Sequence, residues 1–324
     1  MAGSVLVTGA NGSLGVHAVD YILRHYPDIT AILTVRNTSD ADANTKTLRD
    51  TIARYPGAKV SIHQLDLASL TAVHEFAGKI TQDITNKVYP PLSAIVANAF
   101  YWNLVADPEI TSDGYDKTIQ VCHVAHVALI LRLLGSFGPN GGRVVLFTSD
   151  AHWPGQNSYD LELLVKPKPG ADKLGLGFLR YANAKLATVS WMYALDRHLQ
   201  KDANLSKITA LAINPGNLVD SRALRTNTPG MLPYVQKFIL KPLLPLMRLR
   251  DPLLRRVSAG GVDVAKIALD PEYAGARGYY TFLKKDESSP ESREGKKQEA
   301  LWVRSAQWAG ITRENTSLAS AVGD

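Results

Sequence analysis

Three side chains in the middle of the chain have the chemistry of proton transfer next to a carbonyl group. Tyr181 and Lys185 are four residues apart at the start of a predicted helix, so they share one face of it. A phenol has a pKa of about 10 in water, and a nearby ammonium stabilises its anion and lowers that pKa. If Ser149 orients a carbonyl oxygen, Tyr181 can protonate it while a nicotinamide cofactor delivers hydride to the carbon. The three residues predict reduction of a ketone or oxidation of the matching alcohol.

A Tyr-x-x-x-Lys spacing also occurs on helices as a surface contact, so the spacing alone does not indicate catalysis. The catalytic interpretation rests on where this pair stands in the chain. Ser149 follows an apolar run that ends at Phe147, as a buried strand does. A glycine-rich turn stands at the start of the chain. We expect Lys185 also to hydrogen-bond the ribose beside the nicotinamide.

The glycine-rich turn follows a first apolar strand at residues 5–7 and leads into a helix that begins near Ser13. Gly9, Gly12 and Gly15 suit a sharp turn whose backbone lies close to a large ligand. The helix start would present free N–H groups and the positive end of its dipole to an anion. A dinucleotide pyrophosphate fits this description, although three glycines in seven residues also occur in ordinary turns.

Apolar runs alternate with helical patterns along most of the chain, which is typical of βαβ units. Right-handed crossovers place helices on both faces of such a sheet, and ligands bind beyond the carboxyl ends of its strands. The predicted fold class is therefore α/β, a doubly wound parallel sheet. The predicted strands lie near residues 5–7, 29–35, 59–65, 93–97, 143–147, 208–213 and 278–282.

Polar residues follow the second, third and fourth predicted strands, where a dinucleotide fold meets its adenosine. Arg36, next to Asn37, can make bidentate hydrogen bonds to a ribose 2′-phosphate and favours NADP(H); an ordinary surface arginine is the alternative. Asp66 can accept from an adenine amino group, or it caps the helix that starts near Ser69. Asn98 stands among small residues that would let a ribose approach the backbone.

Composition is that of a globular protein of one domain, with 324 residues, 45% of them apolar and 20% charged. The single cysteine and the scattered histidines predict neither a disulfide nor a metal site. No known module accompanies the net charge of +6, so we expect no nucleic-acid partner. We also expect no stable membrane span and, without a signal segment, a cytoplasmic location.

The order of these motifs resembles the short-chain dehydrogenase/reductase family, which has a Rossmann fold and binds NAD(P)(H). The resemblance covers nearly the whole chain: residues 8–15, Asp66, residues 97–99, Ser149, Tyr181 with Lys185, and residues 214–216. Finer features, among them residues 149–152 and 301–302, resemble the branch of retinol dehydrogenases and WW-domain oxidoreductases. That branch typically acts on lipophilic ketones and alcohols with NADP(H).

The resemblance implies a role for individual residues. Ser149, Tyr181 and Lys185 would be catalytic, residues 215–218 would border the nicotinamide, and Ser221 would supply a hydroxyl for its carboxamide. The implied cofactor contacts are Thr8, Gly9, Asn11, Gly12, Ser13, Leu14, Gly15, Arg36, Asn37, Asp66, Leu67, Asn98, Ala99, Tyr181, Lys185, Pro215, Gly216, Asn217, Leu218 and Ser221.

Three positions depart from the family's pattern. Ser13 replaces a glycine of many relatives, and Phe100 follows Ala99 where a glycine is usual. Cys122 stands where the family has an asparagine that helps hold a proton-relaying water, and a thiol is a weak donor and acceptor. Cys122 can also be a small buried apolar residue. Besides redox turnover, the replacement leaves open a non-redox cyclisation or isomerisation and a cofactor-binding regulatory protein without catalysis.

Two inserts, residues 150–180 and 222–256, are expected to lie over the substrate pocket of this single domain. The first contains Pro154 and Tyr159. The second carries apolar residues at roughly helical spacing and is predicted to be a lid over a large lipophilic substrate. A contact between subunits of a homo-oligomer is the second interpretation and a membrane surface the third. A last short helix is expected at residues 298–308.

Overall fold

A computed structural model describes residues 3–153 and 160–322 of the chain. Pro154 and Tyr159 of the first insert lie outside the described residues. Eight strands form one sheet: β1 (Ser4–Val7), β2 (Thr30–Val35), β3 (Lys59–Gln64), β4 (Leu92–Ala97), β5 (Gly142–Phe147), β6 (Ile208–Asn214), β9 (Gly278–Thr281) and β10 (Lys284–Lys285).

The strand order is β10-β9-β6-β5-β4-β1-β2-β3, and neighbouring strands run parallel except β10 and β9. The chain starts in the middle of the sheet, winds outward through β2 and β3, and returns to β4 on the other side of β1. The predicted doubly wound parallel sheet is confirmed. The switch point of the winding lies between β1 and β4, where such folds bind their ligands.

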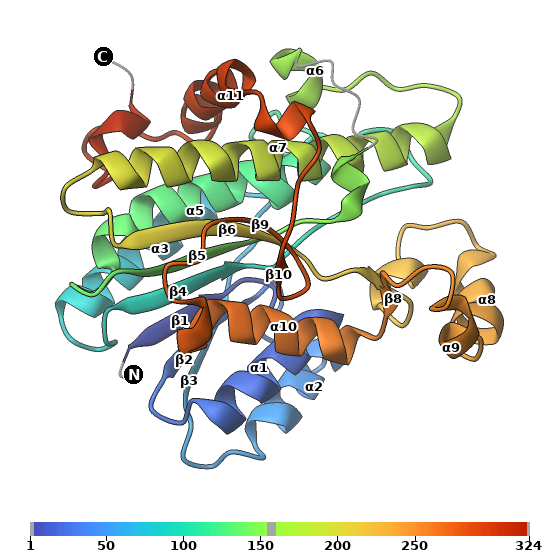
Figure 1. Cartoon of the computed structure of the whole chain (residues 1–324), viewed down its shortest axis with the longest axis horizontal. Coiled ribbons are helices and arrows are strands. Elements are labelled where there is room, and N and C mark those ends of the chain that lie inside the picture. Colours follow the sequence, from blue (N-terminus) through green and yellow to red (C-terminus); the bar gives the residue numbers. More distant parts are fainter. Residues whose placement is uncertain (1–2, 154–159, 323–324) are drawn as a thin grey trace.

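Helices cover both faces of the sheet (Figure 1). Because β1 and β2 are thus enclosed on both sides, every residue in them is buried, which explains why most of their residues are apolar. One face carries α1 (Ser13–His25), α2 (Ala43–Ile52) and α10 (Val257–Leu269). The other carries α3 (Leu70–Thr85), α5 (Ala125–Leu133) and α7 (Lys173–Lys201), with α11 (Gly295–Trp308) packed outside α7.

The sequence led us to expect that Tyr181 begins its helix, and this expectation is wrong. Helix α7 begins eight residues earlier at Lys173, where the Asp172 side chain accepts a hydrogen bond from the N–H of Gly175. Glycines early in a helix weaken the local signal for it, and tertiary packing overrides that preference here. Tyr181 therefore stands on a fully formed helix, which holds its side chain more firmly than a helix end would.

The helix after β3, α3, is not capped by Asp66, which was one of the two roles that the sequence allowed for this residue. Ser69 is its N-cap, and the Ser69 hydroxyl accepts from the N–H of Ala72 at 3.3 Å. Asp66 instead accepts from the N–H of Ala68 at 2.9 Å. The cap thus belongs to Ser69, and Asp66 remains at the end of the strand.

The second insert forms short helical turns: α8 (Leu232–Val235), a π-helical turn (Gln236–Leu240) and α9 (Leu244–Met247). Two short strands that the sequence did not reveal, β7 (Asn217–Leu218) and β8 (Leu254–Arg255), pair in parallel at the base of the insert. Figure 1 shows α8 and α9 set apart from the layered sheet at one end of the molecule.

One helical stretch in the described part of the chain, Lys117–Ser136, is long and apolar enough to cross a membrane by those two criteria. It includes α4 (Lys117–Ile119), a π-helical turn (Gln120–Val124) and α5. Within its most apolar window, 89% of the residues are buried inside the fold. Its apolar character is thus accounted for by packing against the sheet, α3 and α7.

Candidate active site

A cavity of about 840 Å³ opens along the carboxyl ends of the parallel strands, from the glycine-rich turn to Tyr181. Three predicted site residues, Thr8, Gly15 and Lys185, do not line it. The predicted residues that do line it are Gly9, Asn11, Gly12, Ser13, Leu14, Arg36, Asn37, Asp66, Leu67, Asn98, Ala99, Ser149, Tyr181, Pro215, Gly216, Asn217, Leu218 and Ser221.

The glycine-rich turn has the shape of an anion cradle. Gly9 has a φ of +61°, and a Cβ on Gly15 would lie 2.7 Å from the carbonyl oxygen of Gly9, closer than any side chain tolerates. Gly12 is the N-cap of α1 and brings no side-chain acceptor, so the first N–H groups of the helix stay free at the cavity wall. A pyrophosphate fits this site, because helix N-termini favour negative charge.

Thr8 lies beneath the turn and holds it. Its Oγ1 accepts from the backbone N–H groups of Asn98 and Ala99, both at 3.0 Å. The hydroxyl hydrogen is then available to His126 Nε2, 2.9 Å away. This assigns the imidazole proton to Nδ1, which donates to the carbonyl of Cys122 at 3.4 Å. Burial lowers the pKa of His126 to about 4, in keeping with a neutral ring.

We expect acid to destabilise the fold through His126. An unfolded histidine has a pKa of about 6.5, so below that pH the unfolded chain binds a proton that the folded His126 ring does not bind. Since the folded pKa is about 4, stability present above pH ~6.5 is lost as the pH falls towards 4, by up to about 1.4 kcal/mol per pH unit. Urea unfolding between about pH 7 and 5 measures this loss. His126→Gln should make the fall shallower, while His123, whose pKa burial lowers to about 3, keeps its own share; an unchanged slope would contradict the assignment.

Asn98 also turns towards the glycine-rich turn. Its Nδ2 donates to the carbonyl oxygens of Thr8 at 2.9 Å and Gly9 at 3.1 Å. Asn98 is followed by Ala99 at the cavity wall, so the small residue that we expected beside a cofactor ribose lies at the cavity. The amide acts as a brace that ties the end of β4 to the turn after β1.

Arg222 is a residue of this site that the sequence did not reveal. Its backbone N–H and its Nε donate to the hydroxyl of Ser13 at 2.9 and 3.1 Å, and its guanidinium also binds the carbonyl oxygen of Asn11. The side chain thus reaches across from the loop after β6 to the glycine-rich turn and lines the cavity. A local sequence pattern does not predict a contact between residues that are 209 positions apart. The nearest residue that the sequence assigned to the site was Ser221, the neighbour of Arg222.

Tyr181 stands in an aromatic cage at the other end of the cavity. Its ring lies 6.1 Å from that of Phe100 and 5.4 Å from that of Trp102, measured between centroids. Ser149 and Tyr181 both line this end of the cavity, and the Ser149 side chain is close enough to Tyr181 to influence its pKa. The structure therefore brings Ser149 and Tyr181 together at the cavity wall, as a shared carbonyl oxygen would require.

The pKa of Tyr181 differs from our expectation that Lys185 would lower it. Burial raises the pKa above the ordinary value of a phenol, and the nearby Ser149 side chain offsets this in part. Lys185 is itself fully buried, which lowers its own pKa, and its Nζ donates to the carbonyl of Phe147 at 2.9 Å. Its Nζ lies 5.6 Å from the centre of the Tyr181 ring. Without a cofactor, Tyr181 is therefore a neutral phenol.

Ser149 is held by two neighbours. Its hydroxyl donates to Asp150 Oδ1 at 2.9 Å, and the other carboxylate oxygen accepts from Asn217 Nδ2 at 3.3 Å. His152 Nδ1 lies 2.6 Å from the carbonyl of Ser149, while its Nε2 accepts from the N–H of Ser289 at 3.0 Å. His152 thus links the Ser149 loop to the C-terminal part of the chain.

Cys122 is buried in the π-helical turn after α4. Its Sγ lies 3.5 Å from the backbone N–H of Tyr101 and donates to the carbonyl of the same residue at 3.3 Å. Burial raises the pKa of the thiol, so it stays neutral. The side chain thus fastens the loop after β4 and is engaged there, whereas its effect on a proton relay stays a prediction.

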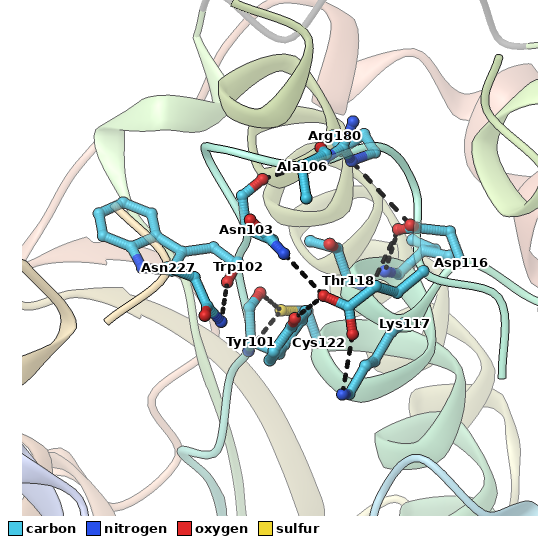
Figure 2. A network of polar contacts seen from close by, with 12 residues as sticks. Tyr101, Trp102, Asn103, Ala106, Asp116, Lys117, Thr118, Cys122, Arg180 and Asn227 are labelled. Carbon is cyan, nitrogen blue, oxygen red and sulfur yellow. Dashed lines mark hydrogen bonds and ion pairs between the residues drawn. The ribbon is translucent and has the colours of Figure 1, made fainter. Parts of the chain in front are cut away.

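A polar network fixes the cavity wall that precedes Tyr181 (Figure 2). Arg180 donates to the carbonyls of Asn103 at 3.0 Å and Ala106 at 2.8 Å, and its Nε lies 4.0 Å from Asp116 Oδ2. In the same network, Glu109 accepts from the side chains of Tyr101, Asn103 and Lys117. The loop that carries Tyr101 and Trp102 is therefore tied directly to the helix that carries Tyr181.

Two family profiles match the chain. The short chain dehydrogenase profile covers residues 4–160, and the AcuH dehydrogenase domain covers residues 222–318. In the residues that the structure describes, no three His, Cys, Asp or Glu side chains gather as a metal site would require.

Known proteins resemble the chain along its whole length or in its C-terminal part. The short-chain dehydrogenase iccH of Talaromyces variabilis is 27% identical over 98% of both chains. The dehydrogenase acuH of Aspergillus aculeatus is 41% identical over 28% of this chain and 94% of its own. Retinol dehydrogenase 13 of Homo sapiens is 26% identical over 95% of this chain and 85% of its own.

A solved structure shares the fold. The crystal structure of an actinorhodin polyketide ketoreductase with NADPH superposes with a TM-score of 0.59 at 17% identity, over 87% of this chain and 97% of that one.

Proposed function

Since this chain belongs to the short-chain dehydrogenase/reductase family, in the branch of the retinol dehydrogenases and WW-domain oxidoreductases, we propose that it reduces a lipophilic ketone with NADPH. It is an oxidoreductase of a family that uses nicotinamide cofactors. The observation that carries the proposal is the pairing of Ser149 with Tyr181 at one end of a cavity whose other end is the glycine-rich turn.

The bound cofactor would supply hydride to the substrate carbon; the chain's own residues do the rest. Ser149 holds the substrate oxygen, and Tyr181 gives that oxygen its phenolic proton, which leaves an alcohol. Tyr181 is protonated at neutral pH, as proton donation to the substrate oxygen requires. Lys185 stands one helical turn behind and would stabilise the phenolate that forms. Lys185 does not line the cavity, so it would have to move to reach a cofactor ribose.

The cavity wall supports a large apolar substrate. Beyond Tyr181 it is formed by Tyr101, Trp102, Phe178, Leu224 and Leu240, which come from both inserts and the loop after β4. Large aromatic and aliphatic surfaces bind ring-bearing ketones through burial of apolar area.

One arginine supports NADP(H) over NAD(H), and a second supports binding of the phosphates that both cofactors share. Arg36 lines the cavity at the end of β2, where the adenosine ribose lies in dinucleotide folds. Arg222 lies at the glycine-rich turn and would add positive charge near the phosphates. Both can make charge-assisted hydrogen bonds with phosphate oxygens.

Arg36→Ala is expected to weaken NADPH binding about 10- to 100-fold, because a hydrogen-bonded charge pair is lost. NADH, which lacks the 2′-phosphate, should lose much less. Titration calorimetry with both cofactors measures the difference. Arg54→Ala, which removes an exposed arginine outside the cavity, is the matched control. Equal losses for both cofactors would contradict a role in reading the 2′-phosphate.

The Cys122 replacement favours one alternative, a non-redox reaction in the same cavity. NADPH absorbance followed during product formation separates the two, since one cofactor consumed per product excludes a cyclisation or isomerisation. Product formation without NADPH loss would overturn the proposed reduction. Tight NADPH binding with no turnover of a broad ketone panel would favour a regulatory protein. We further propose a cytoplasmic location and no nucleic-acid partner.

A further inference from the structure

We propose that the outer face of the second insert binds an anionic lipid surface. This insert face consists of the exposed apolar side chains of residues 231–249 and the cations among them. The proposal does not depend on the cofactor or on the reaction.

The insert face is unusually apolar for a water-exposed surface. Met231, Tyr234, Phe238, Leu246 and Leu249 are each at least 62% exposed, and Ile239 and Leu243 are exposed beside them. These seven residues are almost half of the 15 large apolar side chains that are exposed in the described part of the chain. Clustered exposure of this kind marks a surface that another phase or partner covers.

The charge of the insert face is of one sign. Lys237, Lys241, Arg248 and Arg250 lie among the apolar residues, and the sequence has no Asp or Glu from Ser221 to Arg250. Apolar side chains interleaved with cations are typical of segments that lie in the plane of a membrane interface. Each cation near an anionic leaflet adds attraction, about fivefold in affinity.

The inner side of the same insert is anchored to the site. Gln236 is buried; its Nε2 donates to the carbonyl of Ser221 at 2.7 Å, and its Oε1 accepts from Arg225. Leu244 is buried too, and Leu240 lines the cavity. The exposed apolar residues themselves do not line the cavity and stand outside this anchored base. A lipid surface bound there would lie beside the cavity.

A second copy of the chain fits the insert face less well. A two-fold contact places the same patch against itself. Lys237, Lys241, Arg248 and Arg250 would then face their own copies without an acidic partner in the stretch. Like charges at such short range oppose association. An anionic surface supplies the counter-charge that a second copy lacks.

Co-sedimentation of the full chain with lipid vesicles tests the proposal. We expect binding to phosphatidylcholine vesicles that contain about one third phosphatidylserine, and at least tenfold weaker binding to phosphatidylcholine alone. Phe238→Asp with Leu246→Asp should reduce binding to the anionic vesicles more than tenfold. Lys237→Glu with Lys241→Glu should reduce it at least tenfold and remove most of its salt dependence. None of these four side chains lines the cavity.

Val88→Asp with Val303→Asp is the matched control, because it places the same charges at exposed apolar positions elsewhere. Thermal unfolding verifies that every variant is folded. The proposal is overturned if wild type fails to bind anionic vesicles, or if the control weakens binding as much as the insert variants. It is also overturned if, without lipid, sedimentation shows a dimer that Phe238→Asp dissociates, since a second copy would then cover the face.

Discussion

Tyr181→Phe is expected to reduce turnover by a factor of about 10³ or more while leaving the affinity for NADPH nearly unchanged. The substitution removes the phenolic proton that the proposed mechanism gives to the substrate oxygen. It keeps the ring, which packs against Phe100 and Trp102, so the cavity wall should persist. Steady-state turnover of an aromatic ketone and a fluorescence titration with NADPH measure the two quantities.

Tyr193→Phe is the control for this experiment. Tyr193 lies on the same helix, but its hydroxyl bonds to Ser288 and lies outside the cavity. Its loss should leave turnover close to wild type. Turnover retained by Tyr181→Phe would remove this residue from the mechanism, and an equal loss of NADPH affinity would point to a structural role.

Gly15→Ala is expected to weaken NADPH binding about 5- to 150-fold. The added Cβ would lie 2.7 Å from the carbonyl oxygen of Gly9 and 2.8 Å from that of Ala10. Both neighbours are backbone atoms, so the turn must open, and overpacking of this kind costs about 1–3 kcal/mol. An opened turn no longer presents its N–H groups to a pyrophosphate. Calorimetric titration with NADPH gives the affinity.

Gly57→Ala is the matched control for the turn, because a Cβ at Gly57 has open space around it. Its NADPH affinity should equal that of wild type. If Gly15→Ala bound NADPH as tightly as wild type, the glycine-rich turn would not be the cofactor's anchor.

The fold could be predicted because its signals are local and repeat. Each predicted strand is a short, mostly apolar run between two helical patterns. Strands of this kind are buried on both faces, which is typical of a parallel sheet with helices on both sides. The start of α7 was missed because Gly175 and Gly177 hide its first turn. The pairing of β7 with β8 was missed because two residues carry no period.

The site could be predicted in outline for a similar reason. Residues that follow successive parallel strands meet at one edge, so Gly9, Arg36, Asn98 and Ser149 had to lie along the same edge of the sheet. No comparable rule predicts which residues a long side chain contacts across the fold. Arg222 reaches Ser13 from 209 positions away, and that reach depends on the path of an insert.

The protonation of Tyr181 was predicted in the wrong direction. Spacing places Lys185 one turn from Tyr181, but it does not reveal that both are buried or that the ammonium donates to Phe147. Burial disfavours the charged form of each, which raises the pKa of the phenol and lowers that of the amine. Desolvation is a property of the packed fold and is invisible in a four-residue spacing.

The most direct test of the account is a crystal structure of the protein grown with NADP⁺. We predict the pyrophosphate against the N–H groups of Ser13 and Leu14 at the start of α1 and the nicotinamide ring beside the hydroxyls of Ser149 and Tyr181. A cofactor bound elsewhere, or a nicotinamide ring out of reach of Tyr181, would contradict the account.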